Sequence, residues 1–150
     1  MIFEQIFDTK SSTYTYLVSS GIGREAIIID PVIEDTDKYV QILNNLKLKL
    51  VKVVDTHIHA DHISGLNELN TQTNCLRIMG EKSKSEVIDL KIKDNEKINI
   101  ENIELKAIYT PGHTDCSYSF LMNDRVFTGD TLLINGTGRT DFQNGSSYDA

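Results

Sequence analysis

Cysteine is scarce in this sequence, which has only two among its 150 residues, and tryptophan is absent. The two thiols, Cys75 and Cys116, lie far apart in the chain and form no CxxC pair. The sequence therefore indicates neither a disulfide framework nor a zinc site built from thiolates. Any metal that this chain binds is expected to be held by nitrogen and oxygen atoms.

Basic residues and long apolar runs are also in short supply. The chain has 15 Lys and Arg against 22 Asp and Glu, a net charge of −7, so it offers no basic surface to phosphate backbones or anionic lipids. No apolar stretch approaches the ~18 residues that a membrane-spanning helix needs, and residues 1–10 lack the pattern of a signal peptide. We expect a cytoplasmic protein that binds neither nucleic acid nor membranes.

The remaining composition, 39% hydrophobic and 25% charged, is typical of one globular domain spanning residues 1–150. Residues 2–7, 13–18 and 25–30 have the composition of β-strands separated by turns, which predicts an antiparallel start to the fold. The run at residues 26–29 lacks polar alternation, so that strand is expected to be covered on both faces.

A helix is predicted next, beginning near Asp35 or Thr36. Its apolar residues have the helical spacing i, i+3, i+4 and i+7 and form one stripe: Tyr39, Ile42, Leu43 and Leu46. An apolar strand over residues 48–54 follows, and the order strand, helix, strand predicts a β-α-β unit. A second helix is predicted from Asp61 through Leu69. Later strands are predicted at residues 103–109, 117–122 and 126–127.

All four histidines fall in two short motifs, HIHADH and PGHT. In extended backbone, residues i and i+2 project to the same side, so His57 and His59 are expected to approach a common point as they leave the preceding strand. Asp61 and His62 follow in the next turn. Imidazole and carboxylate are the usual ligands of zinc, iron and manganese, so this cluster predicts a metal site.

Two more candidate ligands lie further along the chain. His113 follows Pro111 and Gly112, which suit a loop that delivers one side chain to a site, and Asp130 follows Gly129 in a similar way. Alone, a histidine is usually solvated and an aspartate after glycine is usually a turn residue. Three histidines and a carboxylate within six residues are not explained in that way, because such close charges need a partner.

The set HxHxDH, PGHT and a later TGD resembles the metallo-β-lactamase superfamily. The resemblance implies an α/β (α+β) fold, the αββα sandwich, with a metal site between its two sheets. That superfamily includes lactam, thioester and phosphoester hydrolases as well as oxygenases, so the fold alone does not determine the reaction. The family pattern continues past residue 150, and we therefore expect the sandwich to be C-terminally incomplete.

Residues 127–134, FTGDTLLI, and 138–142, GRTDF, are similar to the persulfide dioxygenases. That resemblance implies one Fe²⁺ per chain, held by two histidines and one carboxylate, with open positions for a substrate sulfur and dioxygen. The implied activity is an oxidoreductase reaction in which O2 oxidises glutathione persulfide to sulfite and glutathione, with no organic cofactor. The implied iron ligands are His57, His113 and Asp130.

The other residues of the histidine motif have a different role in this resemblance. His59, Asp61 and His62 are expected to form hydrogen bonds to the ligands or to bound water, although they are ligands in dinuclear hydrolases. Arg139 is a candidate for binding a glutathione carboxylate through its guanidinium group. An ion pair with Asp141 is the alternative role of Arg139, and we favour that structural interpretation.

Two rival functions stay open. The first is a glyoxalase II-like thioester hydrolase, in which two Zn²⁺ ions bridged by Asp130 would activate water. The second is an inactive metal-binding fragment, or a half-domain that must assemble with a missing segment. An incomplete sandwich would expose a sheet edge and apolar surface, which favours pairing with another copy of the chain as a homo-oligomer.

Overall fold

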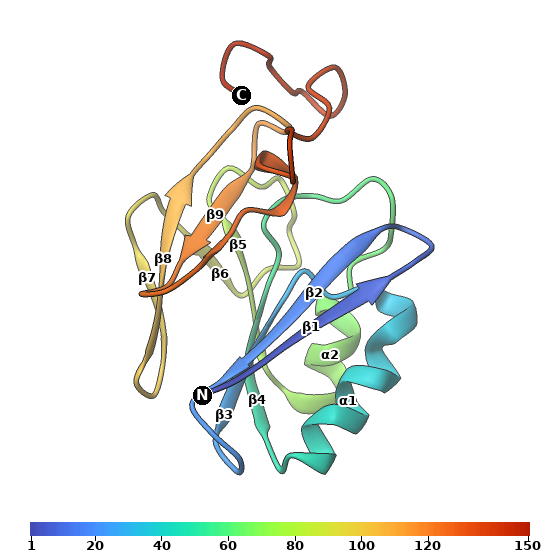
Figure 1. The fold of residues 1–150 in the computed structure, drawn as a ribbon, viewed down its shortest axis with the longest axis vertical. Coiled ribbons are helices and arrows are strands. Elements are labelled where there is room, and N and C mark those ends of the chain that lie inside the picture. Colours follow the sequence, from blue (N-terminus) through green and yellow to red (C-terminus); the bar gives the residue numbers. More distant parts are fainter.

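Two β-sheets face each other, and two helices lie against the outer face of the larger sheet, as Figure 1 shows. The computed structural model describes residues 1–150. The larger sheet has six strands in the spatial order β1 (Ile2–Asp8), β2 (Thr13–Ser19), β3 (Glu25–Ile29), β4 (Lys49–Val54), β5 (Leu76–Gly80) and β6 (Leu90–Ile92). The smaller sheet has four, in the order β10 (Val126–Phe127), β9 (Tyr118–Leu121), β8 (Ile103–Tyr109) and β7 (Lys97–Ile100).

The larger sheet begins as an antiparallel meander and continues as a parallel sheet. β1 pairs with β2 and β2 pairs with β3 in antiparallel register, so the predicted antiparallel start is confirmed. β3 and β4 are parallel and are joined through the helix α1 (Thr36–Asn45), which confirms the predicted β-α-β unit. The parallel strands end at one edge of the sheet, and in open sheets of this kind ligands bind beyond the carboxyl ends of the strands.

The second helix starts later than the sequence predicts. α2 spans Leu66–Thr73, so the expected start at Asp61 is wrong. The loop before it is tied to the end of β3 instead: the Gly65 N–H donates a hydrogen bond to the Pro31 carbonyl at 2.7 Å, and the Ile33 N–H donates one to the Ile63 carbonyl at 2.9 Å. These long-range bonds and the antiparallel bridge between Val32 and Ser64 hold residues 61–65 in a non-helical conformation.

The short strands are the other difference from the sequence-based expectation. β8 and β10 have the predicted bounds, and β9 is one residue shorter at each end than predicted. The sequence patterns do not predict β5, β6 or β7, which have five, three and four residues. These three strands are defined by their pairing with neighbouring strands and not by a local apolar pattern: β5 pairs with β4, β6 with β5 and β7 with β8.

Two apolar clusters hold the layers together. One fills the space between the two sheets with 15 buried residues, and the other fills the space between the larger sheet and the helices with 13. Strand β3 contributes residues to both clusters, because Ile27 and Ile29 belong to the first and Ala26 and Ile28 belong to the second. This strand is therefore covered on both faces, as its unbroken apolar run predicts.

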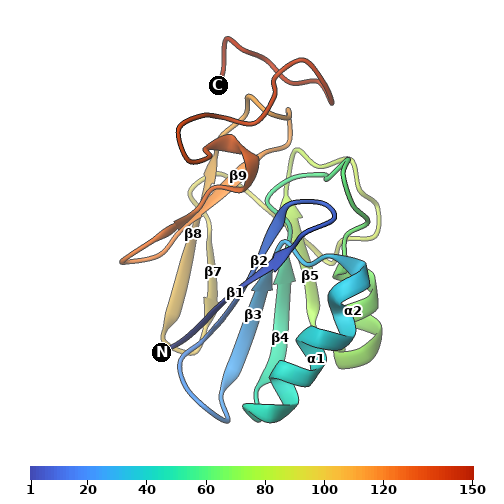
Figure 2. The same cartoon turned by 45° about the vertical axis from the view of Figure 1, so that its right-hand side comes forward.

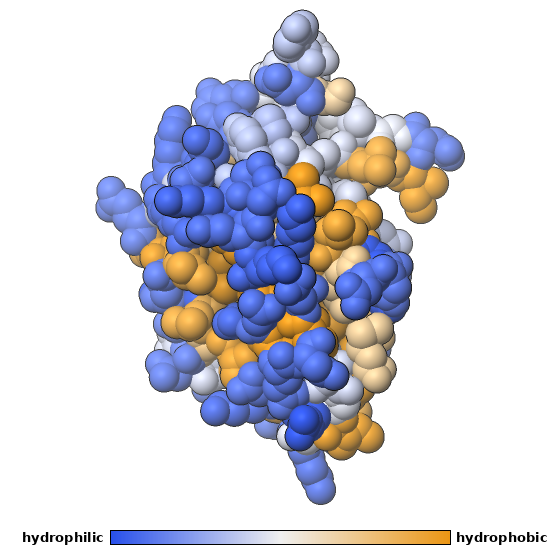
Figure 3. Space-filling model, turned by 90° about the vertical axis from the view of Figure 1, so that its left-hand side faces the viewer, coloured by the Kyte–Doolittle hydropathy of each residue, from blue (hydrophilic) through white to orange (hydrophobic).

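The outer face of the smaller sheet carries no helix within residues 1–150, as Figure 2 shows. Figure 3 faces this side of the molecule and shows apolar atoms between the polar side chains. Leu121 and Val126, which pair across β9 and β10, are both exposed there. The structure thus contains three layers of the expected αββα sandwich, namely helices, sheet and sheet. Neither helix is long and apolar enough to cross a bilayer.

Gly80→Ala should destabilise the contact between the two sheets. Gly80 ends β5, and a methyl group there would overlap the ring of Tyr118, which is fully buried. Because the packed ring cannot move aside, we expect the free energy of unfolding to fall by about 1–3 kcal/mol in urea denaturation. Gly136→Ala is the matched control, since its new methyl group would meet no atom within 4 Å. Equal stability of the two variants would contradict this packing.

Candidate metal centre

The candidate metal centre lies where the carboxyl ends of β3 and β4 meet the smaller sheet. Asp30 directly follows β3, and the histidine motif follows β4. The Thr56 carbonyl accepts a hydrogen bond from the Tyr118 N–H at 2.8 Å, which ties the histidine loop to β9. His113 lies in the loop between β8 and β9, and Asp130 lies just after β10. Both sheets therefore supply side chains to one place.

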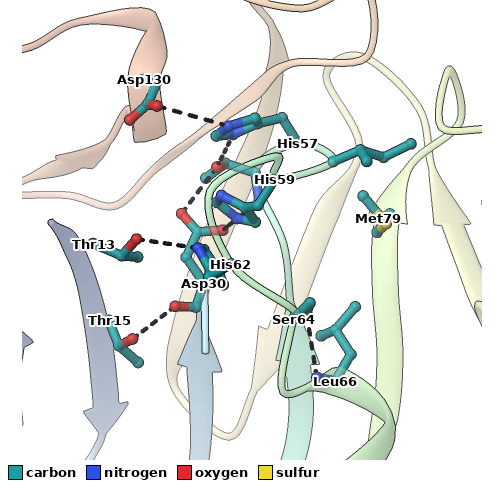
Figure 4. Close-up of polar contacts among 12 residues, drawn as sticks. Thr13, Thr15, Asp30, His57, His59, His62, Ser64, Leu66, Met79 and Asp130 are labelled. Atoms are coloured by element: carbon teal, nitrogen blue, oxygen red, sulfur yellow. Dashed lines mark hydrogen bonds and ion pairs between the residues drawn. The ribbon is translucent and has the colours of Figure 1, made fainter. Parts of the chain in front are cut away.

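The first cluster consists of His57, His113 and Asp130, whose ligand atoms all lie within 4.8 Å of one another. An Asp130 carboxylate oxygen lies 3.5 Å from Nε2 of His113 and 4.0 Å from Nε2 of His57. Only 2% of the His57 side chain is exposed, against 46% of the Asp130 side chain, so the cluster is open to solvent on the carboxylate side. Figure 4 shows Asp130 pointing toward His57 from the opposite loop. The structure thus brings together the three residues predicted to hold iron.

Glycines make this approach sterically feasible. Gly129 has φ +49°, in the left-handed region, and a side chain there would overlap the Thr56 hydroxyl. Gly112 has φ +146°, which agrees with the sharp turn predicted before His113. A side chain at Gly138 would overlap the Asp130 carbonyl and approach the His113 ring. Glycine at 129 thus lets the Asp130 segment approach Thr56, and glycine at 138 leaves room for Asp130 and His113.

The second cluster consists of His59, Asp61 and His62, whose ligand atoms also lie within 4.8 Å of one another. Nδ1 of His62 lies 3.3 Å from an Asp61 carboxylate oxygen, and the Thr13 hydroxyl lies 3.2 Å from both side chains. Nε2 of His62 is buried and has no hydrogen-bond partner. The ring centroids of His57 and His59 are 4.2 Å apart, so these two histidines approach each other as predicted.

A third group contains two residues to which the sequence analysis assigns no role, Asp30 and Asp55, together with His59. The Asp30 carboxylate accepts hydrogen bonds from the Thr56 N–H at 2.6 Å and the Thr56 hydroxyl at 2.9 Å, and it lies 3.2 Å from Nε2 of His59. Both of its oxygens are thus engaged, and Asp30 acts as a hydrogen-bond acceptor. One signal could have identified this pair, since each aspartate directly follows a buried apolar strand.

Burial and neighbouring charges act differently on the groups of this centre. Burial lowers the pKa of His57 to about 3, so the ring is neutral at pH 7, the form that binds metals. Burial also disfavours the charged form of His59, but the hydrogen bond to Asp30 and nearby carboxylates outweigh it and raise the pKa of His59 to about 9. Burial raises the pKa of Asp55 to about 7 and also raises that of Asp130.

Arg139 contacts the centre through its backbone. Its carbonyl accepts a hydrogen bond from Nδ1 of His113 at 2.7 Å, which holds the imidazole ring in place. Its guanidinium group pairs with Asp141 at 2.8 Å, the ion pair that the sequence analysis favours, and it lies 5.4 Å from the centre of the Phe142 ring. Both partners of this ion pair are well exposed, so solvent and salt can compete with it.

Comparison with known proteins assigns the fold to a family. Residues 8–150 match the family described as the Metallo-beta-lactamase superfamily. The chain belongs to this superfamily. Its histidine motif, PGHT and TGD segments are thus motifs of a metal-binding fold, and the structure places their His and Asp side chains in two candidate ligand groups.

Two similar relatives within the superfamily carry different functional names. The mouse protein named persulfide dioxygenase ETHE1, mitochondrial, is 41% identical over 148 residues, covering 97% of this chain and 58% of the mouse protein. A hydroxyacylglutathione hydrolase of Dictyostelium discoideum is 32% identical over 140 residues, covering 87% of this chain and 52% of that protein. The chain therefore spans little more than half the length of these relatives. The predicted cytoplasmic location stays a prediction.

Solved structures of the superfamily are also similar to this chain. The crystal structure of ETHE1 from Myxococcus xanthus superposes with a TM-score of 0.94 and 43% identity, covering 97% of this chain and 64% of that one. A metallo-beta-lactamase from Staphylococcus aureus superposes with a TM-score of 0.87 and 30% identity, covering 97% of this chain and 48% of that one. The predicted fold class is thereby confirmed.

The raised pKa of His59 predicts a pH-dependent stability for the metal-free chain. In the folded state this pKa is about 9, above the ordinary value of 6.5, so the folded chain holds a proton that the unfolded chain releases between these values. The stability that this proton confers is complete below pH 6.5 and is lost as the pH rises through 9.

The measurement is urea denaturation in the presence of a chelator at several pH values. The free energy of unfolding should fall between pH 7 and 9 in the unaltered chain, and His59→Gln should flatten the profile over the same interval. A profile that keeps the same slope after this substitution would rule out His59 as its source.

Proposed function

We propose that this chain is the metal-binding part of an iron-dependent persulfide dioxygenase that oxidises glutathione persulfide with O2. The observation that carries the proposal is the convergence of two imidazoles and one carboxylate, His57, His113 and Asp130, in a chain 41–43% identical to proteins named persulfide dioxygenase or ETHE1.

The donor set suits a single ferrous ion. Nε2 of His57, Nε2 of His113 and the Asp130 carboxylate make no hydrogen bond within the chain, so all three are free to bind a metal. When bound, iron would supply the redox chemistry, since a two-histidine, one-carboxylate set leaves coordination positions open for substrate and dioxygen. Zn²⁺ accepts the same donor types, so the choice of iron rests on the relatives and on the reaction proposed.

The chain's own residues would hold and orient this set. His57 presents a neutral nitrogen from a buried ring, and the Arg139 carbonyl fixes the ring of His113. Asp130 completes the set from the exposed side, which is where a substrate can approach. Holding the reacting groups in a fixed geometry removes much of the entropic part of the barrier.

The proposed reaction is balanced without an organic cofactor. One glutathione persulfide, one O2 and one water give glutathione, sulfite and two protons. The terminal sulfur loses four electrons, which O2 accepts, and the sulfur–sulfur bond breaks with glutathione as the leaving thiol. The partners are therefore small molecules.

Arg139 is a candidate for binding the substrate through its side chain. Its guanidinium group is exposed and paired with Asp141, so a glutathione carboxylate would have to replace Asp141 to bind it. The position of its carbonyl against His113 gives Arg139 a structural role at the centre that does not depend on the side chain. Binding of a glutathione carboxylate by the Arg139 side chain is therefore a minor part of the proposal. Homo-oligomer formation stays a prediction.

A dinuclear zinc thioester hydrolase is the second candidate function. It is supported by the second cluster, His59, Asp61 and His62, because His62 holds a buried Nε2 that lacks a partner. A relative named hydroxyacylglutathione hydrolase is 32% identical. Metal content separates the two candidates, because the dioxygenase requires one iron per chain and the hydrolase requires two zinc ions.

Oxygen uptake tests the proposed activity. The chain is purified anaerobically, loaded with Fe²⁺ and mixed with glutathione persulfide; we expect about one iron per chain and one O2 consumed for each sulfite formed. A form lengthened toward the size of the relatives is assayed in parallel. Uptake by the lengthened form alone would favour the inactive-fragment interpretation, and two zinc ions per chain with thioester hydrolysis would favour the hydrolase.

His113→Ala and His59→Ala test which cluster holds the iron. We expect His113→Ala to lose iron almost completely, because it removes a donor atom from the first cluster. His59→Ala should keep most of its iron when the metal is in excess, with an affinity lower by about 10–100-fold, as expected when a residue only supports the ligands. Iron bound per chain is measured by elemental analysis. Equal loss in both variants would contradict the assignment of His59.

A further inference from the structure

Asp30 is a buried carboxylate that contacts the metal centre without belonging to either ligand cluster. Only 3% of the residue is exposed, and Figure 4 shows it beneath the rings of His57 and His59. One of its carboxylate oxygens accepts the Thr56 N–H, and the other accepts the Thr56 hydroxyl. Asp30 is therefore surrounded by donors and acts as a hydrogen-bond acceptor.

The Thr56 hydroxyl connects Asp30 to His57. It has one hydrogen and two close partners, because Oγ1 lies 2.9 Å from Oδ2 of Asp30 and 2.9 Å from Nδ1 of His57. Thr56 gives its hydrogen to the Asp30 carboxylate, so toward His57 it can only accept one. The proton of the neutral His57 ring then lies on Nδ1, and Nε2 keeps its lone pair on the side of Asp130.

We propose that Asp30 and Thr56 are positioning residues that select this tautomer of His57 and so prepare it to bind metal. The same carboxylate holds Nε2 of His59 at 3.2 Å, so one group orients both histidines of the HxH motif. The inference deepens the proposed function, because it takes His57 as a ligand. It is independent of which metal binds and of which reaction follows.

The backbone around Asp30 fixes the position of its carboxylate. Asp30 has φ +52°, a left-handed conformation that non-glycine residues rarely adopt and that a following proline disfavours further. Its N–H donates to the Val54 carbonyl at 2.9 Å, and its carbonyl accepts from the Thr15 hydroxyl at 2.7 Å. The surrounding bonds thus hold a conformation that would otherwise be unfavourable.

A second set of hydrogen bonds links this position to the helix layer. The Tyr39 hydroxyl on α1 lies 2.9 Å from the Thr15 hydroxyl, and it accepts the Val32 N–H at 3.2 Å. Since Thr15 gives its hydrogen to the Asp30 carbonyl, it accepts the hydrogen of Tyr39. Each donor in this chain of bonds has one acceptor, so the geometry leaves a single consistent arrangement of protons from α1 to Asp30.

Threonine variants test the proposal in the metal-free chain by ¹⁵N NMR, which distinguishes the two imidazole tautomers. We expect His57 to carry its proton on Nδ1 in the unaltered chain and in Thr56→Ser, which keeps the hydroxyl. Thr56→Val has a similar shape without the hydroxyl, and it should lose this preference. Thr36→Val is the control, because it removes a buried hydroxyl that is bonded to the Ile33 carbonyl and forms no hydrogen bond with Asp30, Thr56 or the histidines.

Asp30→Asn gives a second, directional test. The amide oxygen must stay on the side of the Thr56 N–H and His59, so the amide NH2 faces the Thr56 hydroxyl. That hydroxyl then accepts from the amide and donates to Nδ1 of His57, which moves the ring proton to Nε2. We expect the Nε2–H tautomer of His57 to dominate in this variant.

Cobalt(II) affinity, measured by competition with a chelator, gives the functional consequence. We expect affinity to fall about 10–100-fold in Thr56→Val and Asp30→Asn and to stay near that of the unaltered chain in Thr56→Ser and Thr36→Val. A His57 ring protonated on Nε2 in the unaltered chain would overturn the proposal, as would an unchanged tautomer in Thr56→Val. The NMR result does not depend on dioxygenase activity. A negative oxygen-uptake assay would therefore contradict the proposed function without contradicting the proposed role of Asp30 and Thr56.

Discussion

A buried carboxylate stays ionised only when hydrogen-bond donors replace the water it has lost, and at Asp30 this requirement organises the whole centre. The donors come from the Thr56 backbone and hydroxyl and from His59, all in the segment that follows β4. Because Asp30 itself directly follows β3, satisfying its charge brings the ends of two neighbouring parallel strands together. The candidate metal ligands of the histidine motif are then presented by a loop that is hydrogen-bonded at its base.

Thr56 links the Asp30 carboxylate at the edge of the larger sheet to the smaller sheet. Its side chain lies between Asp30 and the backbone of Gly129, and its carbonyl accepts the Tyr118 N–H. Asp30 after β3, Tyr118 of β9 and Gly129 after β10 therefore all lie against Thr56. Asp130, which follows Gly129, lies close to His57 because glycine lets the backbone there approach the Thr56 side chain. The contacts around Thr56 thus both join the two sheets and bring the candidate ligands close together.

Sequence patterns predict the parts of this structure that depend on local order. The unbroken apolar run of β3, the stripe of α1 and the spacing of the histidine motif each have a direct structural counterpart. The start of α2 is not predictable in this way, because bonds from Gly65 to the distant Pro31 decide it. The role of Asp30 escapes prediction for a similar reason, since its partners are 26 and 29 residues away.

The two ligand clusters are chemically unequal, and this inequality bears on how many metals the centre holds. In the first cluster the nitrogens of His57 and His113 and the carboxylate of Asp130 are free, and burial keeps the His57 ring neutral. In the second, the Asp61 carboxylate already accepts the Thr13 hydroxyl and contacts His62.

His59 adds to the difference, because the Asp30 carboxylate raises its pKa to about 9, whereas a metal ligand must be neutral. A metal entering the second cluster at pH 7 must displace that proton, and each pKa unit above the ambient pH lowers affinity about tenfold. The carboxylate that we propose prepares His57 for a metal therefore also works against metal binding at His59, and this supports the proposal of one metal per chain, in the first cluster.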